Sequence, residues 1–369
     1  MPSTVMASNM TQKNRLHLRS DIDCSNKSSR INYDKPLSFT YGNKIYGGYE
    51  GDTVASALLA NGVDIIGRSF KYSRPRGIVA AGAEEPNAIL QMGATEATQV
   101  PNVRATQQEL FNDLVCGATN GWPSEGFDLM SYVGKVGGEI MPPGFYYKTF
   151  MWPANFWEKY EYIIRHSAGL GKSPTEPDPD IYDHKYIHCD VLVIGAGISG
   201  IMAAKTAAKN NLKTLLLDEK NEIGGSTIFQ NSEHIKINDQ NSSTWLENEI
   251  NELRSIENLE IKTRTSVAAY HGYNYLLARE NLTDHLPKNE KNKNIRQRLL
   301  KIRAKKVIVA TGSLERPLVF NNNDRPGIML SSAVKKYADY YGVATGQKNI
   351  FFTNNDTAYE SAIALNNKV

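Results

Sequence analysis

A glycine-rich turn at residues 195–200 is the part of the chain best suited to chemistry. Gly195-Ala196-Gly197-Ile198-Ser199-Gly200 follows one apolar run and opens another that has helical spacing. The three glycines of this pattern permit a tight turn, close approach of the backbone to a pyrophosphate, and close packing of helix on strand. The helix N-terminus would offer the anion unpaired N–H groups and a positive dipole end. The pattern predicts a dinucleotide-binding site.

Asp218 ends the next apolar run, at the position where a carboxylate accepts hydrogen bonds from ribose hydroxyls. A carboxylate there repels the 2′-phosphate of NADP, which leaves NAD or FAD, although Lys220 weakens the exclusion. The Gly224-Gly225 pair is either a simple turn or part of the same site, and Ala310-Thr311-Gly312 is the usual second fingerprint. The predicted cofactor-binding residues are Gly195, Ala196, Gly197, Ser199, Gly200, Asp218, Glu219, Lys220, Gly225, Ser226, Ala310, Thr311 and Gly312.

The sequence offers no recognisable catalytic or metal-binding residues. Cys24, Cys116 and Cys189 are too few and too far apart for a disulfide framework, a redox Cys-x-x-Cys pair or a four-ligand metal site. His184 and His188 are four residues apart but stand beside prolines where a strand is expected to begin, which does not favour a metal site. A reductase of the glutathione or thioredoxin type is excluded.

Composition indicates two folded units of ordinary type. The 369 residues are 41% hydrophobic and 22% charged, with a formal net charge of +3 spread along the chain. Neither a nucleic-acid footprint, a membrane span nor a secretory signal is expected, so we predict a cytoplasmic protein. Lys13, Arg15 and Arg19 without an acid fit either a solvated N-terminus or, less well, a transit peptide.

The patterns along the chain predict the elements that would position the site. Residues 36–51 indicate a hairpin and residues 54–60 a capped helix, as in a small β-grasp module. Residues 173–180, rich in proline, indicate a linker. A strand at 190–194, a helix at 201–210 and a strand at 214–217 form a βαβ unit. Further expectations are a helix at 245–256, strands near 259–261 and within 265–303 around a polar loop at 284–296, and a strand at 306–310.

Residues 122–162 are dense in aromatic side chains. Their prolines and glycines exclude one long helix, so the segment is expected to pack irregularly across two domains or, as the alternative, to dock another subunit.

Long motifs then resemble one family. Among them are residues 51–63 (GDTVASALLANGV), 67–78 (GRSFKYSRPRGI), 144–153 (GFYYKTFMWP) and 323–330 (NDRPGIML). In these motifs the chain is similar to the N-terminal part of the alpha subunit of heterotetrameric sarcosine oxidases. The resemblance implies a ferredoxin-like β-grasp domain followed by a Rossmann-type FAD/NAD(P)-binding domain of the two-dinucleotide-domain class.

The resemblance also implies an activity and its cofactors. The assembled enzyme demethylates sarcosine to glycine, forming hydrogen peroxide and 5,10-methylenetetrahydrofolate, with NAD on the alpha subunit and FMN at the interface with the beta subunit. Beta, gamma and delta subunits are the implied partners, and this chain alone is expected not to oxidise sarcosine. Related amine and proline dehydrogenase subunits hold a [2Fe–2S] cluster with four cysteines. Residues 80–88 here contain none, so no iron–sulfur cluster is expected.

Two other functions stay open at this stage. The fingerprint also suits an FAD-binding subunit of an amine, opine or proline dehydrogenase, and the chain could be a non-catalytic assembly fragment. The expected domains are a flexible 1–34, a ferredoxin-like 35–95, a connecting 96–180, a dinucleotide-binding 181–340 and a truncated second βαβ unit at 341–369. That last unit is expected as a strand at 349–353 and a helix at 356–365, poorly packed from residue 342 onward.

Overall fold

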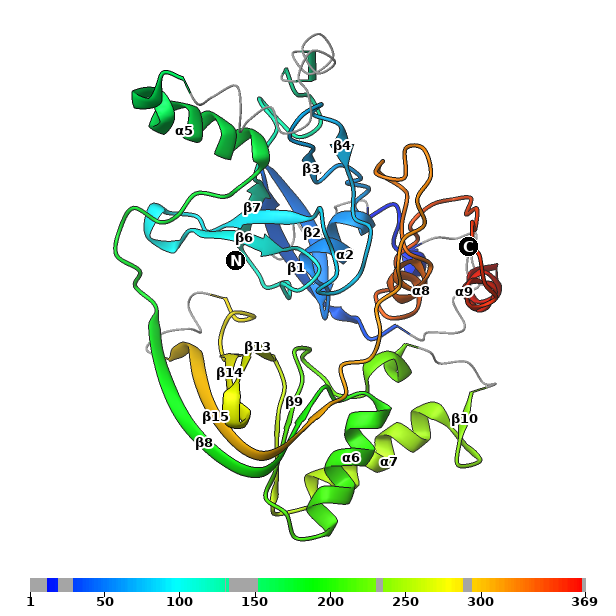
Figure 1. Cartoon of the computed structure of the whole chain (residues 1–369). Helices are drawn as coiled ribbons and strands as arrows, with labels where there is room; N and C mark the ends of the chain where they lie inside the picture. The colour runs from blue at the N-terminus through cyan, green and yellow to red at the C-terminus, as the bar shows by residue number, and fades with distance from the viewer. Residues whose placement is uncertain are drawn as a thin grey trace. The chain divides into compact units, whose positions relative to one another are not determined.

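The computed structural model describes residues 12–18, 29–129, 131–132, 152–229, 235–287 and 294–366. The chain divides into two compact units, one formed by residues 1–179 with 315–369 and the other by Asp180–Leu314 (Figure 1). Among the described residues, no helix has both the length and the apolar character needed to cross a bilayer.

The first unit is built on a five-stranded sheet with the order β2-β1-β7-β5-β6. Strand β1 (Asn32–Tyr41) forms the predicted hairpin with β2 (Lys44–Glu50), turning at Gly42, whose φ of +60° suits a residue without Cβ. On its other edge β1 pairs in parallel with β7 (Leu114–Ala118), and β5 (Ile89–Met92) pairs antiparallel with both β7 and β6 (Val100–Arg104). The sheet therefore extends beyond residue 95, where we expected the module to end.

Helix α2 (Val54–Ala60) lies entirely in the core of this unit. All of its residues are buried, which suits a helix whose side chains are all small or aliphatic. The helix is capped as predicted, and the cap is Thr53, which accepts a hydrogen bond from the Ser56 N–H while the Ser56 hydroxyl oxygen accepts one from the Thr53 N–H. The short strands β3 (Gly67–Arg68) and β4 (Pro75–Arg76) pair outside the main sheet. Other elements of this unit are the short helices η1 (Leu16–Leu18), η2 (Glu96–Thr98) and η3 (Ala154–Phe156) and the exposed helix α5 (Trp157–Ala168).

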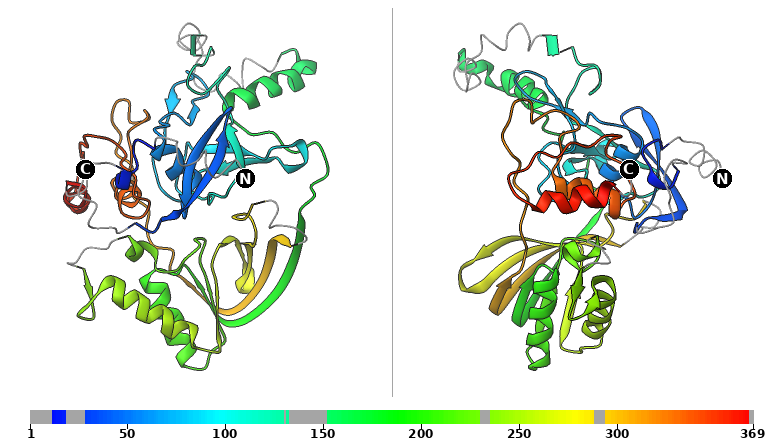
Figure 2. Two further views of the ribbon diagram at one scale, coloured as in Figure 1. Left: turned by 180° about the vertical axis from the view of Figure 1, so that it is seen from behind. Right: turned by 90° about the vertical axis from the view of Figure 1, so that its right-hand side faces the viewer.

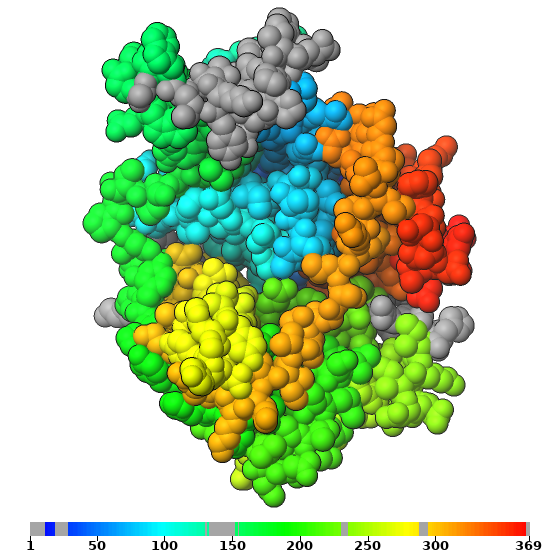
Figure 3. Space-filling view, viewed as in Figure 1, coloured from blue at the N-terminus to red at the C-terminus, as the bar shows by residue number. Residues whose placement is uncertain are grey.

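Residues 315–369 belong to the first unit, which differs from the predicted boundary at 340. Figure 3 shows residues after 314, in orange, against the blue and cyan residues of the same unit, and ion pairs from Arg74 and Arg76 to Asp324 hold them there. Helices α8 (Ser331–Asp339) and α9 (Thr357–Asn366) lie side by side in both views of Figure 2. Contacts between residues far apart in sequence, which a local pattern does not encode, thus place residues 315–369 in the first unit.

The C-terminal expectations are partly wrong. A helix is present at α9, but residues 349–353 form no strand, because a strand exists only with a hydrogen-bonded neighbour and none is supplied. Packing does not fail from residue 342 either: Val343 is fully buried, and the Ala344 N–H donates to the Asn14 carbonyl at 2.8 Å. Exposure begins later, at Gln347, and includes the apolar Ile350 and Phe352.

The second unit carries a six-stranded sheet with the order β12-β9-β8-β15-β14-β13. Strands β12 (Leu259–Lys262), β9 (Thr214–Leu217), β8 (Ile181–Ile194) and β15 (Ile295–Val309) are parallel, and β14 (Tyr275–Asn281) and β13 (Thr265–His271) continue the sheet antiparallel. Helix α6 (Ile198–Lys209) follows β8, and α7 (Ser242–Arg254) matches the helix predicted at 245–256. Smaller elements are η4 (Gly225–Ile228), β10 (Lys236–Ile237), β11 (Gln240–Asn241) and η5 (Gly272–Asn274).

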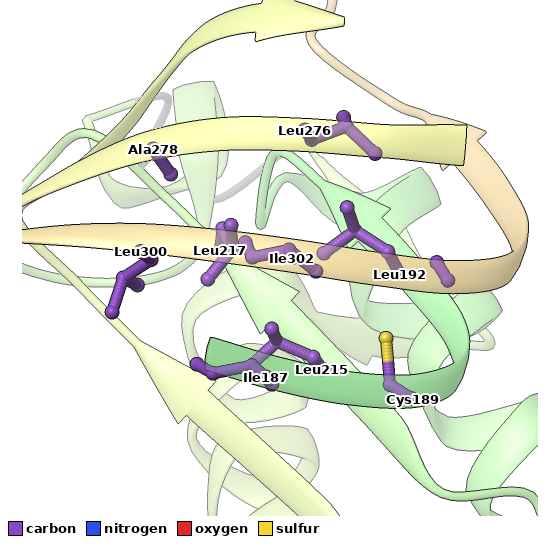
Figure 4. Close-up of a cluster of buried hydrophobic side chains, with 10 residues drawn as sticks. Ile187, Cys189, Leu192, Leu215, Leu217, Leu276, Ala278, Leu300 and Ile302 are labelled. Carbon is purple, nitrogen blue, oxygen red and sulfur yellow. The ribbon is translucent and has the colours of Figure 1, made fainter. Parts of the chain in front are cut away.

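Strands β8 and β15 are much longer than predicted and run together through both halves of this sheet. Their pairing from Ile181↔Ile295 to Ile194↔Val309 joins the parallel and antiparallel parts. The core between them is apolar, with Leu192, Leu276 and Ile302 fully buried (Figure 4). This continuous core fixes where β8 ends, and therefore where the glycine turn begins.

Candidate functional site

The glycine turn stands where sequence reasoning put it, between the end of β8 and the start of α6. Gly195 has φ +97°, and a Cβ added there would lie 2.4 Å from the Ala310 carbonyl oxygen. At Gly200 an added Cβ would lie 1.8 Å from the Gly195 carbonyl oxygen. The first glycine thus makes the turn, and the third lets α6 pack on it.

Gly197 has a different role from these two glycines. It is the N-cap of α6, and an added Cβ would meet nothing closer than the Gly225 Cα at 4.0 Å. Open space at the N-terminus of a twelve-residue helix is where a phosphate can approach backbone N–H groups. Ser199, in the first turn of α6, is exposed. The turn therefore fits a pyrophosphate.

Asp218 follows β9 and is tied directly to the glycine turn. One carboxylate oxygen accepts a hydrogen bond from the Ala196 N–H at 2.7 Å, and the other accepts from the Lys220 N–H at 2.8 Å. The side chain is largely buried, with 9% of the residue exposed. Carboxylate oxygens have further acceptor sites, so ribose hydroxyls can still bind. Glu219, next in sequence, is exposed.

The Gly224-Gly225 pair also lies against the turn. The Gly224 N–H donates to the Ala196 carbonyl at 2.7 Å, and a Cβ on Gly225 would lie 2.8 Å from the Gly197 Cα. Of the two readings left open by the sequence, these contacts favour a part of the same site. Ser226, the next residue, is exposed.

The second fingerprint lies on the neighbouring strand. The Ala310 N–H donates to the Ile194 carbonyl at 2.8 Å, directly before the glycine turn. Thr311 and Gly312 then leave the sheet as exposed residues, and the positive φ of Gly312, +73°, suits glycine. The structure thus brings the predicted residues to one edge of one sheet, at the carboxyl ends of its parallel strands.

A feature that the sequence did not single out adjoins Asp218. A cavity of about 250 Å³ is lined by residues 261–264 and 280–282, and the Thr265 N–H donates to the Asp218 carbonyl at 2.8 Å. Burial lowers the pKa of Lys262, but the hydrogen bonds and negative charges of Glu280 and Glu260 together outweigh that effect, so the pKa is raised and the ammonium stays charged. The pairing of β14 with β13 brings residues 280–282 to residues 261–264, and no local motif marks this polar cavity.

A second, larger cavity does not belong to the dinucleotide site. Its volume is about 420 Å³, and it is lined by residues 188–190, 213 and 303–305. These residues lie where the parallel part of the sheet begins, whereas ligands of such sheets bind at the carboxyl ends of the strands. The geometry at Gly197 and Asp218 therefore identifies the candidate site better than cavity size does. Groups of three or more metal-ligating side chains are absent from the described part of the chain.

Two family models match this chain. Residues 34–121 match a 2Fe-2S iron-sulfur cluster binding domain, and residues 190–313 match an FAD dependent oxidoreductase. The first match overturns the expectation that the chain carries no iron–sulfur cluster, because the family of the domain is a cluster-binding one. The second covers the glycine turn, Asp218 and residues 310–312, and its name gives FAD more weight than the sequence reading did.

The first domain lacks the donor set that such a cluster needs. Such clusters are held by four cysteine thiolates. Residues 34–121 contain one cysteine, Cys116. It is buried in β7, its thiol hydrogen bonds to the Thr40 carbonyl, and burial raises its pKa to about 12, which disfavours the thiolate. The residues present in this domain therefore do not fit ligation of a cluster by four thiolates.

Most of this chain matches the sequences of known proteins. It is 44% identical to the sarcosine oxidase subunit alpha of Rhizobium meliloti over 92% of its length, and 35% identical to that of a Corynebacterium species over 90%. It spans 34% and 29% of those two proteins, respectively. The fold of L-proline dehydrogenase from P. horikoshii covers 94% of this chain, and the chain covers 54% of that protein, with a TM-score of 0.58 at 18% identity. The chain is therefore a homologue of the sarcosine oxidase alpha subunits and spans about a third of their length.

Proposed function

We propose that this chain is the dinucleotide-binding part of a sarcosine oxidase alpha subunit, with NAD bound at the glycine turn. The observation that carries the proposal is the Asp218 carboxylate, which holds the Ala196 N–H while Gly197 leaves the helix N-terminus open. The pyrophosphate would lie against the N–H groups at the start of α6, and the adenosine ribose against Asp218. The bound dinucleotide would supply redox chemistry, and the chain's own residues would bind and orient it.

The names of the relatives support the reaction assigned here. In the proposal, the whole complex oxidatively demethylates sarcosine to glycine, releases hydrogen peroxide and forms 5,10-methylenetetrahydrofolate. Beta, gamma and delta subunits are the proposed partners, with FMN at the interface with the beta subunit. The predicted site of this chain contains no acid–base pair directed at an amine, so we expect sarcosine oxidation to require the partners.

FAD at the same site is the second candidate. The match of residues 190–313 to an FAD dependent oxidoreductase favours it, and it would make the chain a flavin-binding subunit of an amine or proline dehydrogenase. Both dinucleotides share the adenosine diphosphate half that the glycine turn would recognise. What differs is the redox half.

Titration of the purified chain tests the two candidates together. Tryptophan fluorescence with NAD, NADP and FAD should show binding of NAD and much weaker binding of NADP, because Asp218 repels the 2′-phosphate. A yellow protein with a flavin spectrum after purification would instead favour FAD. Binding of none of the three would contradict the proposed site. Co-expression with the beta subunit and a sarcosine-dependent peroxide assay then test the reaction.

A further inference from the structure

The loop between β4 and β5 is wrapped around a single carboxylate. Glu85 is only 1% exposed. One of its carboxylate oxygens accepts hydrogen bonds from the N–H groups of Val79 and Ala80, at 2.8 and 2.7 Å. The other accepts from Asn87 and Ala88, at 2.8 and 3.1 Å. Residues 79–88, called here the Glu85 loop, therefore direct four backbone donors inward from both ends.

The number of donors matches an ionised carboxylate. A carboxylate has two oxygens and about four acceptor positions, so one anion satisfies all four N–H groups. Without it, the N–H groups of Ala80 and Ala88 would be buried and unpaired, which is costly, and those of Val79 and Asn87 would lose their partner. A neutral amide could not replace it, because its NH₂ group would face two of the donors. Converging backbone N–H groups in a loop form an anion-binding concavity, and here the anion comes from the chain itself.

The same peptide groups also hold helix α8. The Ala80 carbonyl accepts a hydrogen bond from the Tyr337 hydroxyl at 3.0 Å, and the Val79 carbonyl accepts from the Leu330 N–H at 2.8 Å. The Ala81 carbonyl accepts from the Lys336 Nζ at 2.8 Å. Val79 and Ala80 thus present N–H groups to Glu85 and carbonyls to the α8 segment. Glu85 fixes the orientation of the peptides that α8 contacts.

We propose that the Glu85 loop is an anion-binding loop whose built-in occupant is the Glu85 carboxylate, and that Glu85 positions α8 through it. In a variant without the Glu85 side chain, the loop would then accept a free carboxylate in its place. Acetate has the same atoms that Glu85→Ala removes beyond Cβ, so it is the matched external ligand.

Hydrogen exchange on the full chain tests the proposal. In Glu85→Ala, amide protection at residues 79, 80, 87 and 88 and in α8 should fall by at least about tenfold, with α6 unchanged. Added acetate or formate should restore protection in a saturable manner, whereas chloride at equal ionic strength should not. Glu84→Ala is the control, since Glu84 is half-buried and forms no hydrogen bond with another described residue. Its exchange should match the unmodified chain.

Two outcomes would overturn the proposal. One is a folded Glu85→Ala protein whose protection acetate does not restore, since an anion-binding ring must accept that ligand. If Glu85→Ala does not fold, Glu85→Gln decides, because it keeps the shape and places an NH₂ group against two donors. Exchange equal to that of the unmodified chain in Glu85→Gln would show that the loop does not require an anion.

Discussion

The guanidinium of Arg15 and the carboxylate of Asp52 form an ion pair at 2.6 Å in which neither side chain is exposed. Arg15 also donates to the Tyr341 carbonyl at 2.8 Å, and Asp52 accepts from the Ser56 hydroxyl at 2.6 Å. The pair therefore connects the beginning of the described chain, the start of α2 and the segment after α8. Because both side chains are fully buried, removal of one partner leaves a buried, unpaired charge.

We expect Arg15→Met to lower the free energy of unfolding by about 3–5 kcal/mol. The matched control is the exposed pair of Lys35 and Glu50 at 3.0 Å, where Lys35→Met should cost about 0–1 kcal/mol. Urea denaturation of both variants measures the difference. Equal, small effects would mean that the Arg15 pair contributes no more than a surface contact.

The glycines of the turn should separate stability from binding. Gly197→Val should leave the unfolding transition almost unchanged, since space surrounds that position, and should abolish dinucleotide binding by blocking the pyrophosphate. Gly200→Ala should destabilise the fold by about 3 kcal/mol, because its Cβ collides with the Gly195 carbonyl. Thermal unfolding and NAD or FAD titration of each variant check this. Undiminished binding in Gly197→Val would contradict the site.

Two cysteines should be chemically silent in the folded protein. Burial raises the pKa of Cys116 to about 12 and that of Cys189 to about 11. At pH 8 both remain thiols, so neither should react with a disulfide reagent until the chain unfolds. The test is to count the modified cysteines by mass spectrometry, with and without denaturant. Rapid native labelling of Cys116 would show that β7 opens readily.

The raised pKa of Cys116 also makes the stability of the fold depend on pH. Its folded pKa, about 12, exceeds the ordinary thiol value of 9.0, so the folded state retains the proton where the unfolded state releases it. Its contribution to stability is complete below pH 9 and is lost as the pH rises toward 12. Cys116→Ser should flatten the decline of unfolding free energy over that range.

Truncation tests the packing after α8. Tyr341 and Val343 are buried, the Tyr341 carbonyl accepts a hydrogen bond from Arg15, and the Ala344 N–H donates to the Asn14 carbonyl. Ending at Tyr340 should therefore cost about 2–4 kcal/mol, and ending at Gln347 should cost less but still destabilise, because it removes Leu365 of α9 from the core that it forms with Leu16 and Ala344. Limited proteolysis should cut first near the exposed Ile350. A first cut at residues 341–345 would contradict this.

The sequence predicted the features that depend on near neighbours. The glycine turn, Asp218 and the Thr53 cap follow from local steric and hydrogen-bonding rules, so their spacing was sufficient. The hydrogen bonds of the Glu85 loop could not be predicted in this way, because they depend on a fold that brings residues 79 and 88 together. The position of residues 315–344 was missed for a stronger reason. Their partners, such as Arg15, lie more than 300 residues earlier, and no local pattern encodes such pairings.

The pairing of Arg15 with Tyr341 spans 326 residues, and the second unit lies entirely between them. During synthesis, the strands and α2 of the first unit leave the ribosome early, but the segment that completes its core leaves only after the whole of Asp180–Leu314. The second unit can therefore finish folding first, reversing the usual N-to-C order of domain completion. Until residue 344 emerges, the core of the first unit would stay incomplete, and we expect chaperones to bind this unit.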